Sequence, residues 1–326
     1  MNTRSVLFRT EPEDKLRRAT QVYLSCGLLE AELLSGGLFN TTYRLETERG
    51  RFILRLGPVN RHLLLPYEQH LMAAEGDILR LLREHGIPTS GIVALDLSGS
   101  LFDRDVMVVS CLDAKSMSVV ELPREAEQRI CREAGILTAR IHAITASDLP
   151  LRPEKPFGRY ANVLSGNGCE TWKEAVFLEL NQWKTMAQSS QLFAPDDIHR
   201  IVTVFERYSG LLDAVTEPRL VHGDLWYGNI LVDEAQNLAA IIDADRAFFG
   251  DTDFELATGW MISDSFLEGY GRQPDCSYEA VLRRRLYKLL LNLEDCYILF
   301  HEYANPGEGN HLRTQILEEI ALLEGK

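Results

Sequence analysis

The sequence predicts an α+β protein with two lobes, a small lobe built on antiparallel strands and a larger lobe that is mainly helical. Its 326 residues suit two domains or one two-lobed unit. Short stretches typical of strands occupy the first third of the chain, and helical periods dominate the rest. We place the boundary near Leu112–Ala114, which gives lobes of residues 1–112 and 113–326.

The first lobe begins with a helix that starts near Pro12 and ends at Gly27, two residue types that favour helix boundaries. Short strands and one further helix follow, and Glu48-Arg49-Gly50 forms a hairpin turn between the second and third strands. The strands are predicted at Glu30–Leu34, Thr42–Thr47, Arg51–Leu56, Ile92–Asp96 and Val106–Ser110, and the helix at Tyr67–Arg83. Mostly antiparallel strands with one helix between them make a small α+β lobe.

The second lobe shows apolar residues at helical spacing, with loops that contain Pro and Gly at residues 150–168 and 189–195. We predict its helices at Arg124–Ala143, Trp172–Ala187, Ile198–Ala214, Phe254–Ser263, Tyr278–Tyr303 and His311–Leu323. A small hairpin interrupts them, with short β segments at Leu220–Val221, Ile230–Val232 and Leu238–Ile242. The lobe is therefore a helical body with a β hairpin set into it.

Composition and charge exclude several classes of protein. With 45% hydrophobic and 25% charged residues, the chain is neither disordered nor of low complexity. The net charge of −14 disfavours binding to nucleic acid, and no apolar run reaches the length of a membrane span. The six cysteines are never closer than 20 residues, which excludes CxxC zinc or redox motifs. We expect a soluble, cytoplasmic monomer or homodimer with small-molecule partners.

The negative charge is concentrated in the second lobe. Residues 1–112 carry 14 acidic and 13 basic side chains, whereas residues 113–326 carry 34 and 21. Two interpretations remain open, a solvated acidic surface and a cleft that attracts a cationic substrate.

The stretch from Leu220 to Ala257 carries the most informative polar residues. Asp224 follows a short apolar strand, Asn229 comes five residues later, and Asp243 follows the second strand of the hairpin. The hairpin brings these three side chains to the same end of the fold, where a buried carboxylate needs a partner. Phosphoryl transfer uses such a set, with one carboxylate to accept a proton and oxygen ligands to hold Mg²⁺. The alternative is that each Asp caps a turn or helix.

The motifs His222-Gly223-Asp224…Asn229 and Ile242-Asp243-Ala244-Asp245 resemble the signature of the aminoglycoside phosphotransferase and choline kinase superfamily. These are small-molecule kinases with a protein-kinase-like fold. The resemblance covers roughly residues 30–265 and extends to the segment Phe249–Ala257. It implies Asp224 as the catalytic base, Asn229 and Asp243 as Mg²⁺ ligands, and ATP or GTP as co-substrate. The segment Gly-Asp-Leu-Trp-x-Gly-Asn is similar to the corresponding segment of fructosamine kinases in particular.

The nucleotide should bind between the first strands, where a loop contains two adjacent glycines. Ser35, Gly36, Gly37 and Asn40 form this loop, whose free backbone N–H groups suit phosphate binding, although many hairpins contain Gly-Gly. The hinge between the lobes, with Ser110 and Leu112, would bind the nucleobase through its backbone.

Arg55 and Glu75 are a candidate ion pair beside the phosphates. Arg55 alternates with Phe52, Leu54 and Leu56 on its strand, so it faces the other side of the sheet; the alternative is a surface arginine. Glu75 lies on the apolar stripe of the predicted helix, where it needs a cationic partner. The resembled kinases place Lys, or in several branches Arg, at the position of Arg55.

Substrate residues are expected near Asp224. Trp226 and Tyr227 follow it, and we favour packing of Trp226 under the loop over stacking on a substrate. The acidic candidates for a cationic substrate are Asp245, Glu255, Asp264 and Glu268. For Trp172 and Trp183, 11 residues apart on one helix face, core packing competes with ligand binding. We expect His222 to brace the loop backbone.

The sequence therefore predicts a Mg²⁺–nucleotide-dependent phosphotransferase that acts on a hydroxyl of a small polar, cationic molecule. An aminoglycoside-like substrate fits the acidic second lobe, a ketosamine fits the likeness to fructosamine kinases, and a choline-type amino alcohol fits the superfamily signature. A nucleotide-binding regulatory module without catalysis is the rival from another class.

Overall fold

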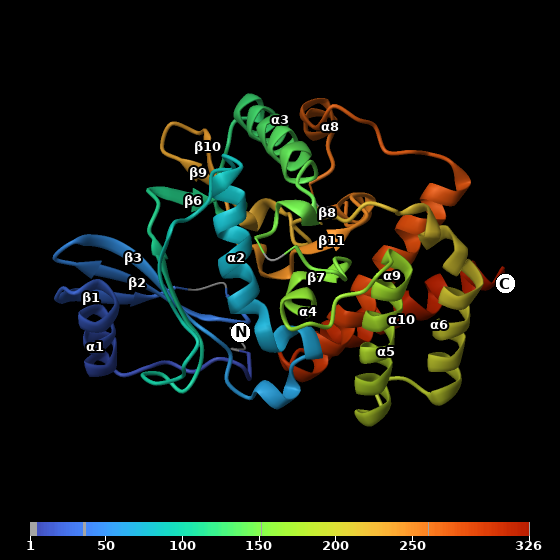
Figure 1. Ribbon diagram of the computed structural model, residues 1–326, viewed down its shortest axis with the longest axis horizontal. Coiled ribbons are helices and arrows are strands. Elements are labelled where there is room, and N and C mark those ends of the chain that lie inside the picture. The colour runs from blue at the N-terminus through green and yellow to red at the C-terminus, as the bar shows by residue number, and fades with distance from the viewer. Residues whose placement is uncertain (1–4, 35–36, 151, 260, 326) are drawn as a thin grey trace.

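A computed structural model describes residues 5–34, 37–150, 152–259 and 261–325. Five antiparallel strands form a sheet in the order β1-β2-β3-β5-β4. The strands are β1 (Leu28–Leu33), β2 (Thr41–Thr47), β3 (Gly50–Leu56), β4 (Ile92–Asp96) and β5 (Val106–Ser110). All five predicted strands are present, with ends that differ by at most two residues. The predicted α+β class is confirmed (Figure 1).

Two helices flank this sheet. Helix α1 (Glu13–Leu24) shares an apolar cluster with the side chains of the strands, including Leu45, Leu54 and Leu56. Helix α2 (Leu71–Glu84) lies between the sheet and the helical part of the molecule, and joins the larger apolar cluster there (Figure 1). The predicted helix began four residues earlier, where the chain forms a 3₁₀ turn at Pro66–His70.

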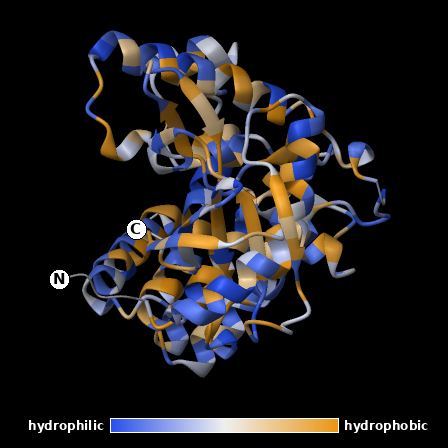
Figure 2. Cartoon of the chain, turned by 90° about the vertical axis from the view of Figure 1, so that its left-hand side faces the viewer, coloured by the Kyte–Doolittle hydropathy of each residue, from blue (hydrophilic) through white to orange (hydrophobic). Residues whose placement is uncertain are grey.

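The remainder of the chain is mainly helical. Figure 2 shows hydrophilic and hydrophobic residues alternating along the helices, as amphipathic patterns predict. The helices are α3 (Arg124–Ile141), α4 (Tyr160–Leu164), α5 (Trp172–Ser189), α6 (Pro195–Tyr208), α7 (Asp253–Ala257), α8 (Asp264–Tyr270), α9 (Tyr278–His301) and α10 (Pro306–Glu324). Among the residues that the structure describes, no helix is long and apolar enough to cross a membrane.

Two three-stranded sheets lie within this helical part. One has the order β10-β9-β6 and the other β7-β11-β8. Their strands are β6 (Ala114–Ser116), β7 (Gly158–Arg159), β8 (Arg219–Val221), β9 (Ile230–Asp233), β10 (Leu238–Ile241) and β11 (Phe248–Gly250). We propose that the boundary between the lobes lies near Leu112–Ala114, because β5 belongs to the large sheet and β6 pairs with β9 of the helical part.

The sequence prediction missed β6, β7, β11, α4 and α8, and it extended α7 to residue 263, six residues too far. Strands of two or three residues show no measurable period, so only their tertiary partners define them. The loop predicted at residues 150–168 is therefore partly ordered. Its Arg159 is paired through β7 to Phe248 of β11.

Trp172 and Trp183 belong to the core of the helical part. Trp172 stacks on Phe248 with ring centroids 5.3 Å apart, and its indole N–H donates to the Tyr287 hydroxyl at 2.8 Å. Trp183 has no exposed surface. The structure therefore supports core packing for both side chains, because both are buried.

Candidate active site

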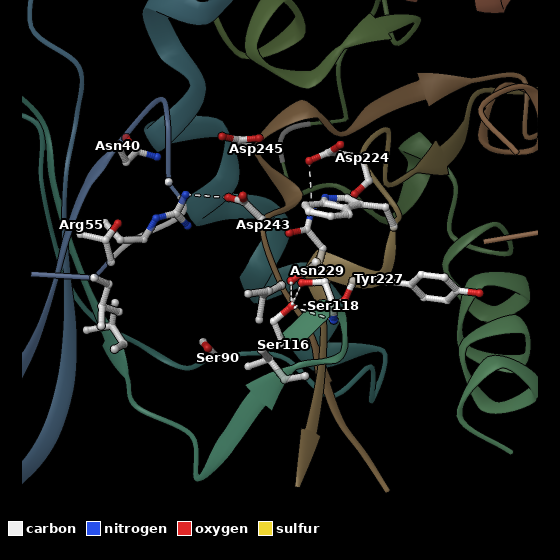
Figure 3. A pocket seen from close by; sticks show the side chains of 18 of the residues that line it. Asn40, Arg55, Ser90, Ser116, Ser118, Asp224, Tyr227, Asn229, Asp243 and Asp245 are labelled. Atoms are coloured by element: carbon white, nitrogen blue, oxygen red, sulfur yellow. Dashed lines mark hydrogen bonds and ion pairs between the residues drawn. The ribbon is translucent and has the colours of Figure 1, made fainter. Parts of the chain in front are cut away.

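A cavity of about 1370 Å³ separates the large sheet from the β9–β10 hairpin. Its lining includes Asn40 and Arg55 from the sheet side, Asp224 and Asn229 from the loop after β8, and Asp243 after β10. Figure 3 shows Arg55 and Asp243 joined across it, with Asp224 and Asn229 on the far wall. The hairpin therefore gathers the three side chains that the sequence predicted at one end of the fold.

The backbone of the loop after β8 depends on Gly223. This residue has φ +80°, and a Cβ atom there would lie 2.5 Å from the carbonyl oxygen of Arg246. Only glycine fits this left-handed, close-packed position. The turn directs Asp224 into the cavity, where Asn229 Nδ2 donates to the Asp224 carboxylate at 2.9 Å and to its carbonyl at 2.8 Å.

His222 and Glu255 support the same loop from below. The backbone N–H of His222 donates to Glu255 Oε2 at 2.8 Å. His222 Nε2 lies 3.1 Å from the carbonyl of Ile242, and its Nδ1 accepts from the Asp224 N–H at 3.4 Å. Burial lowers the pKa of His222, so the ring is neutral with its proton on Nε2. The prediction that His222 braces the loop is confirmed.

The surroundings of Asp224 bring the pKa of its carboxyl group close to neutral pH, which suits a general base. Burial and, to a smaller extent, the nearby Asp243 carboxylate raise the pKa of Asp224 from 3.8 to about 7. Arg246 and the Asn229 hydrogen bond act in the opposite direction. A carboxylate with a pKa near the working pH accepts protons efficiently.

Arg55 forms the ion pair that the sequence predicted with Glu75 of α2. Its other terminal nitrogen lies 2.7 Å from Asp243 Oδ1. Burial raises the pKa of Glu75 to about 7, although Arg55 opposes this shift. Asp243 has φ +64°, an uncommon conformation for a residue other than glycine. The guanidinium therefore links the sheet, helix α2 and the end of β10.

A divalent cation fits the carboxylates at this point. Oxygen atoms of Glu75, Asp243 and Asp245 all lie within 4.8 Å of one another. Burial above all, and then the neighbouring Asp243 and Glu75 carboxylates, raise the pKa of Asp245 well above its ordinary value. Hard oxygen donors in this number suit Mg²⁺. Asn229 lies close to Asp243, because the backbone carbonyl of Asn229 accepts a hydrogen bond at 3.0 Å from the N–H of Ile242, the residue before Asp243.

The predicted nucleotide loop and hinge surround the sheet side of the cavity. Gly37, Asn40, Ser110 and Leu112 line it, whereas Ser35 and Gly36 lie outside the described residues. The Ser110 hydroxyl accepts from the Gly91 N–H at 2.8 Å. Its side chain therefore links the end of β5 to the residue that precedes β4.

Trp226 and Tyr227 are placed differently from each other. Trp226 is 42% exposed, lines the cavity and covers Gly228, where a Cβ would lie 2.1 Å from the indole ring. Trp226 therefore packs on its own loop, as expected, but part of its ring stays exposed at the cavity. Tyr227 points away from Asp224 (Figure 3), and its pKa is raised to about 12 by burial and by contact with Cys131. Its ring serves the packing of the loop against α3.

Three acidic candidates for substrate binding are not at the cavity. Glu255 is buried and its carboxylate accepts backbone N–H groups of the loop. Asp264 and Glu268 are exposed on α8, which packs on α3, and Glu268 pairs with Arg132 at 2.7 Å. Expecting them to face the cleft was wrong, because burial of the apolar faces of α7 and α8 fixes the direction of their acidic residues. Of the four, only Asp245 lines the cavity.

Arg246 and Asp295 also line the cavity, and the sequence analysis did not select them. A usable signal was present for Asp295. It lies with Glu294 inside the apolar run Leu289–Phe300 of α9, and charges within such a run call for partners. The same argument identified Glu75. It would also have identified Glu255 as a buried carboxylate that needs partners, because Phe254 and Leu256 flank it.

The chain belongs to the phosphotransferase enzyme family (APH), whose model matches residues 30–287. It is a small-molecule kinase, as the sequence predicted. A homoserine kinase of Methylobacillus flagellatus is 24% identical over 287 residues, which cover 84% of this chain and 74% of the kinase. A homoserine kinase of Neisseria meningitidis serogroup B is 25% identical over 256 residues, which cover 77% and 72%.

Solved structures confirm the two-lobed, kinase-like fold. A candidate fructosamine-3-kinase of Thermobifida fusca YX-ER1 superimposes with a TM-score of 0.68 at 18% identity, covering 95% of this chain and 99% of that one. Aminoglycoside phosphotransferase APH(4)-Ia gives 0.67 at 14% identity, covering 96% and 98%. A mutant of the same phosphotransferase in complex with AMP-PNP and hygromycin B gives 0.66 at 13% identity, covering 95% and 97%.

Proposed function

We propose that this kinase transfers the γ-phosphate of a Mg²⁺-bound nucleotide to a hydroxyl of a small, amino-bearing molecule. The observation that carries the proposal is the position of Asp224, whose carboxylate lines the same cavity as Arg55, Asn229 and Asp243. The APH(4)-Ia mutant that shares the fold binds AMP-PNP and hygromycin B. This agrees with a cavity that holds a nucleotide and an acceptor together.

Each side chain has a distinct part in this proposal. Asp224 orients the acceptor hydroxyl and takes its proton while the oxygen–phosphorus bond forms and the bond to the leaving nucleoside diphosphate breaks. Arg55, fixed by Glu75, contacts the phosphates of the nucleotide. Asn229 and Asp243 hold Mg²⁺, which neutralises charge on the phosphates when it is bound. Arg55 must release Asp243 to free this carboxylate.

The acidic character of the second lobe, where acidic residues outnumber basic ones by 34 to 21, supports an amino-bearing acceptor. Such a surface favours an ammonium group on the substrate. Aminoglycosides, ketosamines, choline-type amino alcohols and homoserine all carry one. A regulatory module without catalysis is less well supported, because Asp224 keeps both its hydrogen-bond partner and access to the cavity.

The test is Mg²⁺-dependent release of ADP or GDP in the presence of each acceptor class. Replacement of Asp224 by Asn is expected to lower kcat at least about 10²-fold, the usual contribution of a general base, with nucleotide affinity retained. Near-native turnover of this variant would refute the role of Asp224. Nucleotide binding without release stimulated by any acceptor would favour the regulatory module.

A further inference from the structure

The wall of the cavity beyond Asp224 carries a second pair of opposite charges, Arg246 and Asp295. Arg246 follows Asp243 by three residues, and Asp295 lies in the C-terminal half of α9. Their side chains are 16% and 34% exposed, and both line the cavity. A charged pair of this kind at a ligand cavity is a candidate for substrate recognition.

Arg246 is the counter-ion of two carboxylates, and neither of them lies at hydrogen-bond distance from its guanidinium. Arg246 Nη1 lies 3.6 Å from Asp295 Oδ1, and Arg246 Nη2 lies 3.7 Å from Glu68 Oε1. Both distances are longer than an N–H···O hydrogen bond. Within the described part of the chain, the guanidinium of Arg246 donates no closer hydrogen bond, so a ligand can take its N–H groups.

Arg246 and Asp295 are near the reacting hydroxyl. The carbonyl of Arg246 abuts Gly223, the residue before Asp224. Arg246 also acts on the Asp224 carboxylate by lowering its pKa, and Asp295 raises it. A ligand that reaches this pair can therefore also reach Asp224, which lines the same cavity.

The surface around Asp295 is apolar. Leu291, Ile298 and Leu299 stand four residues before and three and four residues after it, which puts all of them on one face of α9. These residues and Leu312 of α10 line the cavity. Such a wall suits a short aliphatic chain, whereas a polyhydroxylated ring would lose hydrogen bonds to water against it.

We propose that Arg246 and Asp295 are specificity-determining residues that bind the carboxylate and the ammonium group of a zwitterionic amino acid whose side chain carries the hydroxyl. The inference rests on the proposed function and narrows its substrate class. A purely cationic substrate would meet the guanidinium of Arg246 without an anionic group to offer it. Homoserine, on which two relatives at 24% and 25% identity are named to act, has this chemistry.

The first arm of the test compares acceptors on the wild-type enzyme. L-Homoserine, L-threonine and L-serine carry both charges, 3-amino-1-propanol lacks the carboxylate, and 4-hydroxybutyrate lacks the ammonium group. We expect one zwitterion to exceed both single-charge analogues of its length in kcat/KM by about 10- to 100-fold, the range of one charge-assisted hydrogen bond. Preference for an aminoglycoside, a ketosamine or choline, with no turnover of zwitterions, would overturn the inference and leave the kinase intact. Failure of every acceptor would refute the proposed function as well.

The second arm uses Asp295→Asn, which keeps the shape of the side chain. We expect KM for the zwitterion to rise about 10- to 100-fold, with kcat and nucleotide KM little changed and the preference over 4-hydroxybutyrate lost. The matched control is Glu279→Gln, which removes an exposed carboxylate from the first turn of the same helix. Equal losses for all acceptors in Asp295→Asn would indicate a structural role and overturn the proposal.

Discussion

Replacing Asp224 by Asn should stabilise the nucleotide-free protein while it lowers kcat at least about 10²-fold. The folded protein raises the pKa of Asp224 from 3.8 to about 7, so ionisation of this group opposes folding. Between these values the folded state binds a proton that the unfolded state has lost, and stability falls as the pH rises. The loss begins near pH 3.8 and is complete above about pH 7. Asn cannot ionise, so the Asp224→Asn variant does not lose this stability as the pH rises.

The expected size follows from the two pKa values. A shift from 3.8 to about 7 corresponds to about 4 kcal/mol at pH 8 and about 2 kcal/mol at pH 5. These are upper values, because the carboxylate faces an open cavity. The stability difference between Asp224→Asn and wild type should therefore grow by up to about 2–3 kcal/mol from pH 5 to pH 8. Other titrating groups are common to both proteins and largely cancel.

Urea unfolding at fixed pH, followed by tryptophan fluorescence in EDTA, measures this difference. The control variant is Glu318→Gln, which removes an exposed carboxylate of α10 and should show no such growth. A difference for Asp224→Asn that stays constant from pH 5 to pH 8 would show that the folded protein does not hold Asp224 at a raised pKa. The electrostatic account of the site would then be wrong.

Three other variants examine the supports of the site. Gly223→Ala places a Cβ 2.5 Å from the Arg246 carbonyl at φ +80°, and should cost at least about 1–3 kcal/mol by urea unfolding; an unchanged midpoint would contradict the packing described. Glu75→Gln weakens the ion pair that positions Arg55, so it should raise the nucleotide KM about 10-fold with little effect on acceptor KM. A raised acceptor KM with an unchanged nucleotide KM would refute this role of Glu75. Glu255→Ala leaves the buried His222 N–H without its acceptor, so it should lower kcat and cost about 1–3 kcal/mol; native values for both would disprove the bracing role.

Local sequence determined the elements with a strong period and the central motif. The five strands of the large sheet and most of the helices followed from alternation, helical spacing and boundary residues. The pairing of Arg55 with Glu75 was also predictable, because a charge on an apolar face must find a partner. In each case the information lies within a few neighbouring residues.

Side-chain direction at the cavity was less predictable. Asp245 and Glu255 are both acidic residues that follow β10, yet Asp245 lines the cavity and Glu255 holds the backbone of the loop beneath it. Their different roles come from the short strand β11, which pairs with β7 and β8 and turns the chain between them. That strand has three residues and no period of its own.

The sequence by itself determined the chemistry available to this protein: an Asp, an Asn and a second Asp, spaced by a hairpin for phosphoryl transfer. Tertiary structure alone decided that Arg246 and Asp295 join them. Arg246 and Asp295 are 49 positions apart in the sequence and meet only because α9 packs beside the loop that follows β10. Apolar burial places these elements, and the polar side chains on them acquire their neighbours as a consequence.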